Sequence, residues 1–255
     1  MGTTIQLHGV TKIKNGDKSL CLVQPLGLLG VVSGVSARGI FAAVLDSPTH
    51  QDYVSQGRRS YSFDLRYALE NCASTEAIAE YMGSPSRAYT YNHVIFMSDG
   101  TSARAFENNF SGLGPNMRRA LRTSTSELNE GILWDEPEAF AAVTAFALKG
   151  NDSSYFWGHP EPQRNSARWE VFRAFMAERP RAITPDDLMG LLCRHQGDSV
   201  PSRRAPGDIY SNGALYLLYL SHEDMTFKAA FLPPDDTPRV PVFDTINLSF
   251  LKERR

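Results

Sequence analysis

The sequence predicts an α+β domain built as a four-layer αββα sandwich, in which two antiparallel sheets are covered by helices on their outer faces. Three observations predict this fold class. Residues 88–109 carry a strong hairpin signal, strand-like segments that follow one another are joined by short turns, and the helical segments come in blocks. Short turns favour antiparallel pairing, and runs of strands separated from runs of helices are typical of α+β domains.

The hairpin at residues 88–109, AYTYNHVIFMSDGTSARAFENN, organises the rest of the chain. Asp99-Gly100 marks the tight turn between its two strands. Large and often apolar side chains occupy both faces of the first strand, residues 89–97. A strand that is apolar on both faces belongs inside a sheet covered on both sides, so we place this hairpin at the centre of the layered domain.

The remaining strands follow from short apolar runs between turn residues. The first 45 residues predict a β-meander with strands at residues 3–10, 19–23, 31–33 and 40–45. Further strands are expected at residues 117–125, 214–221 and 226–232, the last two forming a second hairpin. The glycines near residues 27–39 do not fit a phosphate-binding loop, because no helical pattern follows them. The tail from residue 233 is predicted to be irregular.

The helices are predicted from apolar periodicity and end signals. A pair is expected at residues 61–71 and 75–82, with Ser74 as the N-cap of the second helix. Asp135-Glu136-Pro137 predicts a helix over residues 135–149, because acids and proline favour a first turn. Residues 151–163 are predicted to be a loop and residues 166–178 a helix. Thr184-Pro185-Asp186-Asp187 predicts a last helix that runs to about residue 193.

Composition and charge bound the class of protein. The chain has 255 residues, 42% apolar and 21% charged, and no linker divides it, so we expect one domain over residues 1–255. No apolar stretch is long enough for a membrane span, and no secretory signal is apparent at Met1. A net charge of −2 gives no reason to expect a nucleic-acid partner or a membrane partner.

The three cysteines, Cys21, Cys72 and Cys193, are odd in number and widely spaced. This usage indicates a reducing compartment, by default the cytoplasm, and argues against a disulfide framework or a zinc site. No cofactor and no metal are expected. Serine-hydrolase, zinc-protease and phosphate-loop motifs are all missing from the sequence. The residues alone therefore predict a soluble α+β domain of unspecified activity.

Five segments in order resemble the linear-amide hydrolases of the N-terminal-nucleophile (Ntn) superfamily. The most similar group is the acyl-coenzyme A:6-aminopenicillanate acyltransferase-like peptidases, with choloylglycine (bile-salt) hydrolase and penicillin V acylase as more distant relatives. The segments are GLLGVVSGVSARGI at residues 27–40, RYALENCASTEAI at 66–78, the hairpin at 88–109, RTSTSELNEG at 122–131 and NSARW at 165–169. The resemblance extends over about residues 20–235.

This resemblance implies a four-layer αββα fold and the hydrolysis, or transfer, of an acyl group from a small-molecule linear amide. The nucleophile of the family is a cysteine exposed at the start of the chain by self-cleavage, with its own α-amine as the base. Asparagine side chains and backbone amides stabilise the oxyanion. No cofactor or metal is implied.

The sequence departs from this family at the catalytic positions. Gly2 stands where the cysteine would be, and residues 4–23 align better with later strands, so the nucleophile strand is expected to be absent. Arg122-Thr123-Ser124 replaces the Thr-Asn-His triplet of the family. Two hypotheses follow: an amide hydrolase or acyltransferase whose nucleophile lies on a separate N-terminal piece, or a catalytically inactive protein with a binding or assembly role. Either predicts an unpaired sheet edge that favours a companion chain or a homo-oligomer.

Three residues are candidates for catalysis, each with an alternative structural role. Cys21 is either a nucleophile or a small buried hydrophobe on a strand. Asn129 either stabilises an oxyanion or caps a turn. Arg168 matches the substrate-side arginine of the family, and the alternative is a surface ion pair near the start of a helix.

Five further residues are candidates for substrate binding. Ser36 occupies the position of the family's oxyanion asparagine. Asn92 and His93 either line a pocket or form a hydrogen-bonded structural pair. Tyr155 and Trp157 lie in an aromatic segment that forms either the wall of an acyl pocket or an interface.

Overall fold

The computed structural model of the chain describes residues 7–46, 55–109, 118–157, 162–178, 182–195, 207–210, 214–231 and 240–252. Within these residues, two antiparallel sheets form, one of seven strands in the order β1-β2-β3-β4-β5-β6-β7 and one of three in the order β10-β9-β8. The strands of the large sheet are β1 (His8–Ile13), β2 (Leu20–Pro25), β3 (Ser33–Ser36), β4 (Phe41–Asp46), β5 (His93–Ser98), β6 (Ala103–Asn108) and β7 (Arg119–Arg122). The strands of the small sheet are β8 (Tyr216–Ser221), β9 (Thr226–Phe231) and β10 (Asp244–Ile246).

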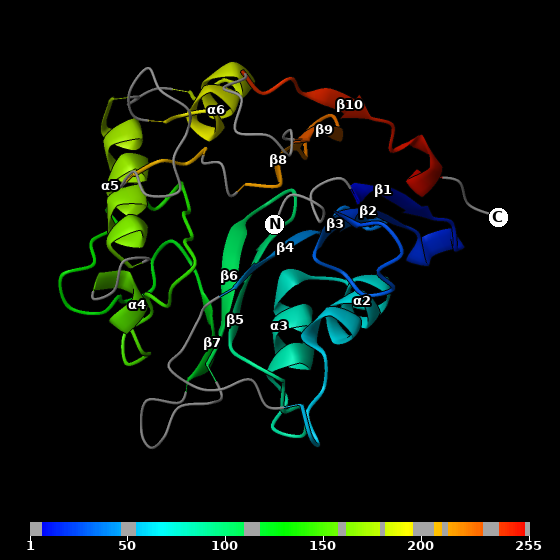
Figure 1. Ribbon diagram of the computed structural model, residues 1–255, viewed down its shortest axis with the longest axis horizontal. Coiled ribbons are helices and arrows are strands. Elements are labelled where there is room, and N and C mark those ends of the chain that lie inside the picture. Colours follow the sequence, from blue (N-terminus) through cyan, green and yellow to red (C-terminus); the bar gives the residue numbers. More distant parts are fainter. Residues whose placement is uncertain are drawn as a thin grey trace.

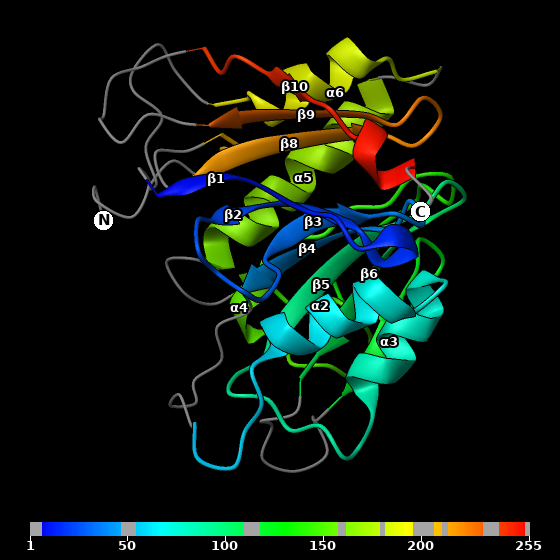
Figure 2. The ribbon, with the colours of Figure 1, turned by 90° about the vertical axis from the view of Figure 1, so that its right-hand side faces the viewer.

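The elements are stacked in four layers, as the sequence predicted. Helices α2 (Tyr61–Asn71) and α3 (Thr75–Gly83) cover one face of the large sheet, and the small sheet lies on its other face (Figures 1 and 2). Helix α6 (Pro185–Leu192) lies on the outer side of the small sheet. This order of helix, sheet, sheet and helix is an αββα sandwich.

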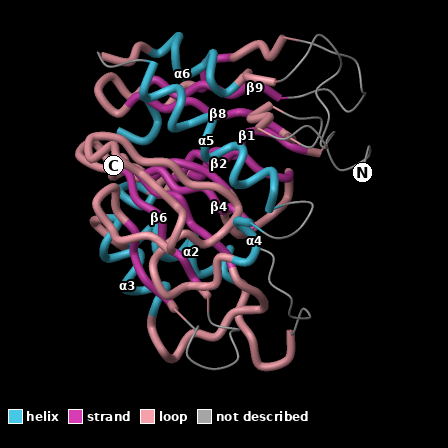
Figure 3. Tube along the Cα trace, turned by 90° about the vertical axis from the view of Figure 1, so that its left-hand side faces the viewer, coloured by secondary structure: helices cyan, strands magenta, loops and turns pink. Residues whose placement is uncertain are grey.

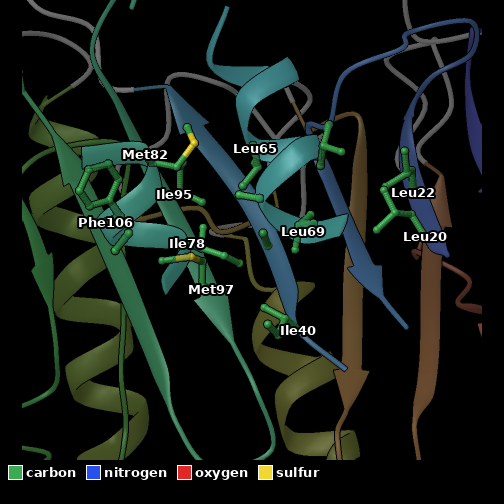
Figure 4. Close-up of a cluster of buried hydrophobic side chains, with 14 of the residues drawn as sticks. Leu20, Leu22, Ile40, Leu65, Leu69, Ile78, Met82, Ile95, Met97 and Phe106 are labelled. Atoms are coloured by element: carbon green, nitrogen blue, oxygen red, sulfur yellow. The ribbon is translucent and has the colours of Figure 1, made fainter. Parts of the chain in front are cut away.

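The largest core lies between the large sheet and the helices α2 and α3. Leu65 and Leu69 of α2 and Ile78 and Met82 of α3 meet strand residues such as Ile95, all of them fully buried (Figure 4). At Gly34 of β3 there is no room for a side chain, because a Cβ there would lie 2.5 Å from the carbonyl oxygen of Cys21. Burying this many apolar side chains is the main stabilising contribution to such a layer.

A second core joins the two sheets. It contains residues of β2, β3 and β4 on one side, and residues of β9, β10 and the 3-10 helix η2 (Ser249–Lys252) on the other. Two side-chain hydrogen bonds also cross between the sheets, one between Ser33 and Tyr216 (3.0 Å) and one between Ser98 and His222 (2.9 Å). Strand β8 is therefore tied to the large sheet near both of its ends.

The segment 139–148 is extended, and the predicted helix over residues 135–149 was wrong. Phe140, Ala142 and Phe146 pack on β5 and β6, whereas Val143 and Ala145 face α5 (Pro162–Glu178) in another cluster. A run that is apolar at almost every position suits a two-faced extended segment as well as a buried helix. Figure 3 shows helices, strands and loops in separate colours, with strands β8 and β9 of the small sheet above strands β2, β4 and β6 of the large sheet.

The other helix predictions were close to the structure. Helix α2 has the predicted bounds, and Ser74 caps α3 by accepting a hydrogen bond from the amide of Ala77. At α6, Thr184 and Asp187 form a full capping box with Pro185 at the first position. The stretch predicted as a loop contains α4 (Ser154–Trp157), and α5 begins at Pro162, four residues before the predicted start.

Three strand predictions needed adjustment. Strand β3 begins at Ser33, where the predicted strand ended. The tail holds the short strand β10 and the helix η2 and so is not wholly irregular, and the short 3-10 helix η1 (Gly16–Lys18) occupies the first turn. The hairpin of β5 and β6 lies inside the large sheet with apolar cores on both faces, as predicted, but on the β7 side of the middle strand β4. Residues 3–6 of the first predicted strand lie outside the described residues.

Candidate functional site

A cavity of about 720 Å³ opens where the β3–β4 turn meets the β8–β9 turn, at one end of the sandwich. Ser36 and Gly39 line it from the large sheet, and Asp224 and Met225 line it from the small sheet. Phe227, Ile246, Leu248 and Leu251, which belong to the core between the sheets, form its apolar part. The volume and the mixture of apolar base and polar rim suit a small organic ligand.

The two turns that border the cavity are fixed by left-handed backbone. Gly39 has φ +77°, and Met225 has φ 57°, which is uncommon for a residue with a side chain. Asp224 accepts hydrogen bonds from the amide and hydroxyl of Thr226. Hydrogen bonds from Ser221 and Thr226 lower the pKa of Asp224 to about 2, so this carboxylate is ionised near pH 7, and the basic residues Arg38 and Lys252 line the same cavity.

Ser36 is the sequence candidate that the structure places at this cavity. The side chain is buried at the end of β3, and its Oγ accepts a hydrogen bond from the amide of Ile40 at 3.3 Å. Because the amide donates to Oγ, the hydroxyl proton of Ser36 remains available as a donor. The role predicted for Ser36 in substrate binding stays a prediction.

Cys21 lies behind the same cavity, in the core between the sheets. The residue is fully buried on β2 and clusters with Phe227, Ile246 and Leu248. Burial raises the pKa of the thiol to about 11, despite the opposing charge of Lys12. A neutral, enclosed thiol is a poor nucleophile, since the thiolate is the reactive form.

A chain of buried polar groups links Asn92 to the inner face of the large sheet. Asn92 donates to Asn109 Oδ1 (3.0 Å), Asn109 donates to Asn151 Oδ1 (2.8 Å), and Asn151 donates to Glu107 Oε2 (3.0 Å). Glu107 pairs with the Arg122 guanidinium at 2.8 Å, and both side chains are buried. Asn92 thus forms part of a structural network.

The Glu107–Arg122 pair holds the extended segment 139–148 on the sheet. The carboxylate of Glu107 accepts hydrogen bonds from the amides of Ala147 and Leu148, and Arg122 donates to the carbonyl of Ala141. Side-chain pairing therefore satisfies backbone groups that a helix would have paired internally. This use of the backbone gives a physical reason why the segment is extended.

Asn129 lies at the far end of the same network. Its Nδ2 donates to the carbonyl of Asn151 at 3.0 Å, and its Oδ1 accepts from the amide of Gly150 at 3.0 Å. The side chain thus closes the loop between residues 129 and 151, which agrees with the turn role considered above. The structure brings Asn92 and Asn129 into one network and places the cavity elsewhere.

His93 lies on the opposite face of the large sheet, beneath α2. The ring is fully buried between Tyr61 and Tyr89, with Nε2 3.0 Å from Asn108 Nδ2. Burial lowers the pKa of His93 to about 3, so the imidazole is neutral at pH 7. Because Asn108 donates to Nε2, the ring proton belongs on Nδ1, where it can reach the carbonyl of Tyr91.

The three remaining candidates belong to the layer of α4 and α5. Arg168 donates from Nε to the carbonyl of Asp208 at 2.7 Å. Tyr155 packs on the cluster between α5 and residues 132–147, and Trp157 is 46% exposed beside Phe156. None of the three lines the 720 Å³ cavity, so their predicted contacts with substrate stay untested.

Sequence reasoning missed two pairs that the fold brings together. Glu107 and Arg122 are 15 residues apart on the adjacent strands β6 and β7, and both strands carry other charged residues, so no pattern singles out this pair. Ser98 and His222 are separated by 124 residues and meet only because β8 crosses the large sheet. No local pattern connects a serine at a strand end with a histidine in a distant turn.

A second cavity of about 780 Å³ lies on the helical side, between α3 and β7. Glu76 and Glu80 border it, and Arg119 is its basic group. The guanidinium of Arg119 already donates to Asn108 Oδ1 and to the carbonyls of Met82 and Ser84. Because its only basic group is committed to the end of α3, this cavity is the weaker candidate for a site.

No protein-family model matches the sequence, and no curated protein does either. The fold, however, resembles those of several solved structures. A Caenorhabditis elegans ortholog of N-acylethanolamine-hydrolyzing acid amidase superimposes with a TM-score of 0.55 at 10% identity, covering 93% of this chain and 84% of that chain. A variant of conjugated bile acid hydrolase from Clostridium perfringens gives 0.55 at 11% identity, covering 98% and 88%. Penicillin V acylase from Agrobacterium tumefaciens gives 0.53 at 11% identity, covering 94% and 75%.

These neighbours are linear-amide hydrolases of the Ntn fold, and this chain shares that fold. The expected αββα architecture is confirmed by the layers and by these comparisons. At identities of 10–11%, the similarity establishes the fold and leaves the reaction to be argued from the site. In the described part of the chain, no helix is long and apolar enough to cross a membrane.

Proposed function

We propose that this chain binds a linear amide with an apolar acyl group and forms the large part of an amide hydrolase or acyltransferase. The observation that carries the proposal is the 720 Å³ cavity, which lies at one end of an Ntn-type sandwich. Its apolar residues suit the acyl group, and Ser36 supplies a hydroxyl near the polar rim. A small-molecule amide is the substrate class that fits both features.

The cysteine nucleophile belongs, in this proposal, to a separate N-terminal segment that adds a strand to β8. Within the described residues, β8 pairs with β9 on one side and with no strand on the other. Alternate residues of such an edge present unpaired N–H and C=O groups to any incoming strand. A companion strand would complete the small sheet by the same hydrogen bonds that join β8 to β9.

Partial exposure on the inner face of the large sheet supports this location. Ala43, Leu45 and Phe96 lie on the inner face of the large sheet and are only partly buried, although Leu45 also packs in the cluster of Phe146 and Phe96 contacts Phe140. The small sheet has three strands against seven in the large sheet, so it covers only part of that face. A further strand beside β8 would cover these side chains.

In the proposed reaction, the cysteine thiol attacks the amide carbonyl, and its own α-amine takes the proton. The leaving amine takes that proton as the C–N bond breaks, and water or an acceptor amine then removes the acyl group. Ser36 is the group of this chain placed to donate to the oxyanion. All three cysteines of the chain are free, which fits the cytoplasmic location that we propose with the activity.

A binding or assembly role without catalysis is the second candidate, and the burial of Cys21 favours it. The thiol nearest the cavity is enclosed and protonated, so this chain presents no reactive cysteine to a ligand there. The edge of β8 that has no strand partner among the described residues would then pair with a second copy of the chain or another protein. A concentration-dependent dimer in sedimentation, with no companion peptide, is the result expected from this role.

The test is the composition and activity of the protein purified from its native source without denaturation. Intact mass and N-terminal sequencing should find a companion that begins with cysteine. The complex should release amine from an N-acylethanolamine, a conjugated bile acid or penicillin V, and alkylation of the companion cysteine should stop turnover. A chain without companion and without turnover would overturn the enzymatic proposal.

Ligand binding can be tested separately from turnover by filling the cavity. Ala37→Phe places a bulky side chain at a residue that lines the 720 Å³ cavity. It should weaken binding of the amide, measured by calorimetry, by tenfold or more. Ala77→Phe is the matched control, because Ala77 lines the other cavity. Equal affinities for the two variants would contradict the assignment of the binding site.

A further inference from the structure

Ser98 and His222 form a hydrogen-bonded pair between the two sheets. Ser98 ends β5 on the face toward the small sheet, and His222 begins the turn that connects β8 to β9. The Ser98 Oγ lies 2.9 Å from His222 Nε2. This distance is within the range that a nucleophilic hydroxyl and its base require.

The pair is accessible, and its surroundings are apolar. Both side chains are only partly buried. Ser98 is paired across the sheet with Phe41 on one side and Ala103 on the other, and Phe96 follows on the same face. An acyl group carried on the Ser98 Oγ would therefore have apolar side chains as its neighbours on the sheet.

The electrostatics favour a neutral imidazole as the base. Burial lowers the pKa of His222 below its usual value, with the nearby Asp99 acting in the opposite direction. Asp99 itself is fixed by hydrogen bonds from the amides of Thr101 and Ser102, so its carboxylate stays close to the pair. A neutral histidine can accept the serine proton, and the neighbouring carboxylate stabilises the imidazolium that results.

We propose that Ser98 and His222 constitute a nucleophilic site that accepts acyl groups from reactive esters. As the bond from Oγ to the carbonyl carbon forms, the Ser98 proton passes to His222 Nε2. The ester C–O bond then breaks, and the leaving alcohol takes that proton. Water attacks the acyl-serine with His222 as base, the acid departs, and Ser98 regains its proton.

The substrate class follows from the donors near the pair. The amides of Thr101 and Ser102 are committed to Asp99 and are not free to hold an oxyanion. The site therefore suits esters with good leaving groups, whose acylation demands less stabilisation of the oxyanion, and it is a poor catalyst for amides. This activity needs no companion cysteine and is independent of the proposed amide hydrolysis.

The alternative is that the pair only joins the sheets, and the chain offers a matched control for that role. Ser33 and Tyr216 also form a hydrogen bond between the sheets at 3.0 Å, but the partner is a phenol and Ser33 is buried. A purely structural serine should behave like Ser33. A nucleophilic serine should differ from it in reactivity toward acylating and phosphonylating reagents.

The experiment is covalent labelling of the intact chain with a fluorophosphonate, with the modified residue identified by peptide mass spectrometry. Wild type should be labelled at Ser98, and Ser98→Ala should lose the label. His222→Gln retains a hydrogen-bonding side chain but loses the base, so labelling should slow by about a hundredfold. Ser33→Ala should be labelled like wild type. Release of p-nitrophenol from p-nitrophenyl butyrate should follow the same order.

Folding is monitored by circular dichroism and by the urea midpoint of each variant. If Ser98→Ala fails to fold, Ser98→Cys replaces it, and iodoacetamide should label that cysteine at least tenfold faster than Cys72. Absence of label at Ser98 in wild type, or equal labelling of wild type and folded His222→Gln, would overturn the proposal. If the native complex hydrolyses no amide but Ser98 is still labelled, the proposed companion nucleophile is contradicted and the proposal for Ser98 is not.

Discussion

Replacing Glu107 by alanine should destabilise the protein more than any substitution of a surface charge. The carboxylate is buried and accepts hydrogen bonds from four groups, namely the Arg122 guanidinium, the amides of Ala147 and Leu148, and the side chain of Asn151. Removing it leaves the guanidinium of Arg122 without its counter-charge in the interior. It also leaves two backbone N–H groups of the extended segment without their acceptor.

The size of the effect follows from these losses. Removing one partner of a buried ion pair costs about 3–5 kcal/mol, because the other charge stays buried and unpaired. For a domain of this size, each 1 kcal/mol shifts the melting temperature by about 2–4 °C. Glu107→Ala should therefore melt roughly 10 °C below wild type. The double variant Glu107→Leu with Arg122→Leu should recover part of the loss, since no charge is then stranded.

The assay is thermal and urea unfolding followed by circular dichroism. Glu127→Gln is the matched control, because Glu127 forms an ion pair with Lys149 in the neighbouring loop with both side chains well exposed. This control should leave the melting temperature unchanged within error, as exposed ion pairs contribute little. If Glu107→Ala melts at the same temperature as the Glu127→Gln control, the Glu107–Arg122 pair does not hold the extended segment in place.

Three further predictions concern other buried groups. His93 is neutral in the fold with a pKa of about 3, whereas in the unfolded chain it takes up a proton near pH 6.5. The contribution of His93 to the free energy of unfolding should therefore be constant above pH 6.5 and be lower by about 2 kcal/mol at pH 5. His93→Gln should flatten this part of the curve of urea midpoint against pH, and an unchanged slope would contradict the assignment. Cys21 should resist iodoacetamide in the native state while Cys72 reacts, as read by peptide mapping, and equal rates would show that the core opens. Gly34→Ala should lower the free energy of unfolding, measured by urea denaturation, by at least about 1 kcal/mol, because its Cβ would meet backbone that cannot move away. Gly100→Ala is the control, because a Cβ at Gly100 would meet no neighbouring atom.

Local signals in the sequence were sufficient for much of the fold. The cap at Ser74 and the capping box at Thr184 and Asp187 set helix starts that the structure confirms. The Asp99-Gly100 turn set the hairpin of β5 and β6. These features are determined by neighbours in sequence, so propensity and spacing are enough to find them.

Residues 135–149 show where such reasoning fails. Acids, proline and alanines favour a helix there. The amides of Ala147 and Leu148 instead donate hydrogen bonds to the carboxylate of Glu107, which lies 40 positions before Ala147. Tertiary hydrogen bonds override a weak local preference. The candidate sites differ in the same way. The position of Ser36 follows from the local turn after β3, whereas Ser98 and His222 become neighbours only when the two sheets stack.

The edge of β8, which has no neighbouring strand within the described residues, also has a consequence for how the chain behaves in concentrated solution. Its sequence, YLLYLS, has no charge, proline or glycine, and so lacks the residues by which edge strands usually avoid one another. Short uncharged segments rich in leucine and tyrosine are templates for cross-β stacking. Expressed without whatever covers this strand, the chain should precipitate as its concentration rises, which light scattering measures. The strand that would admit a partner is thus also a site at which two copies of the chain could associate.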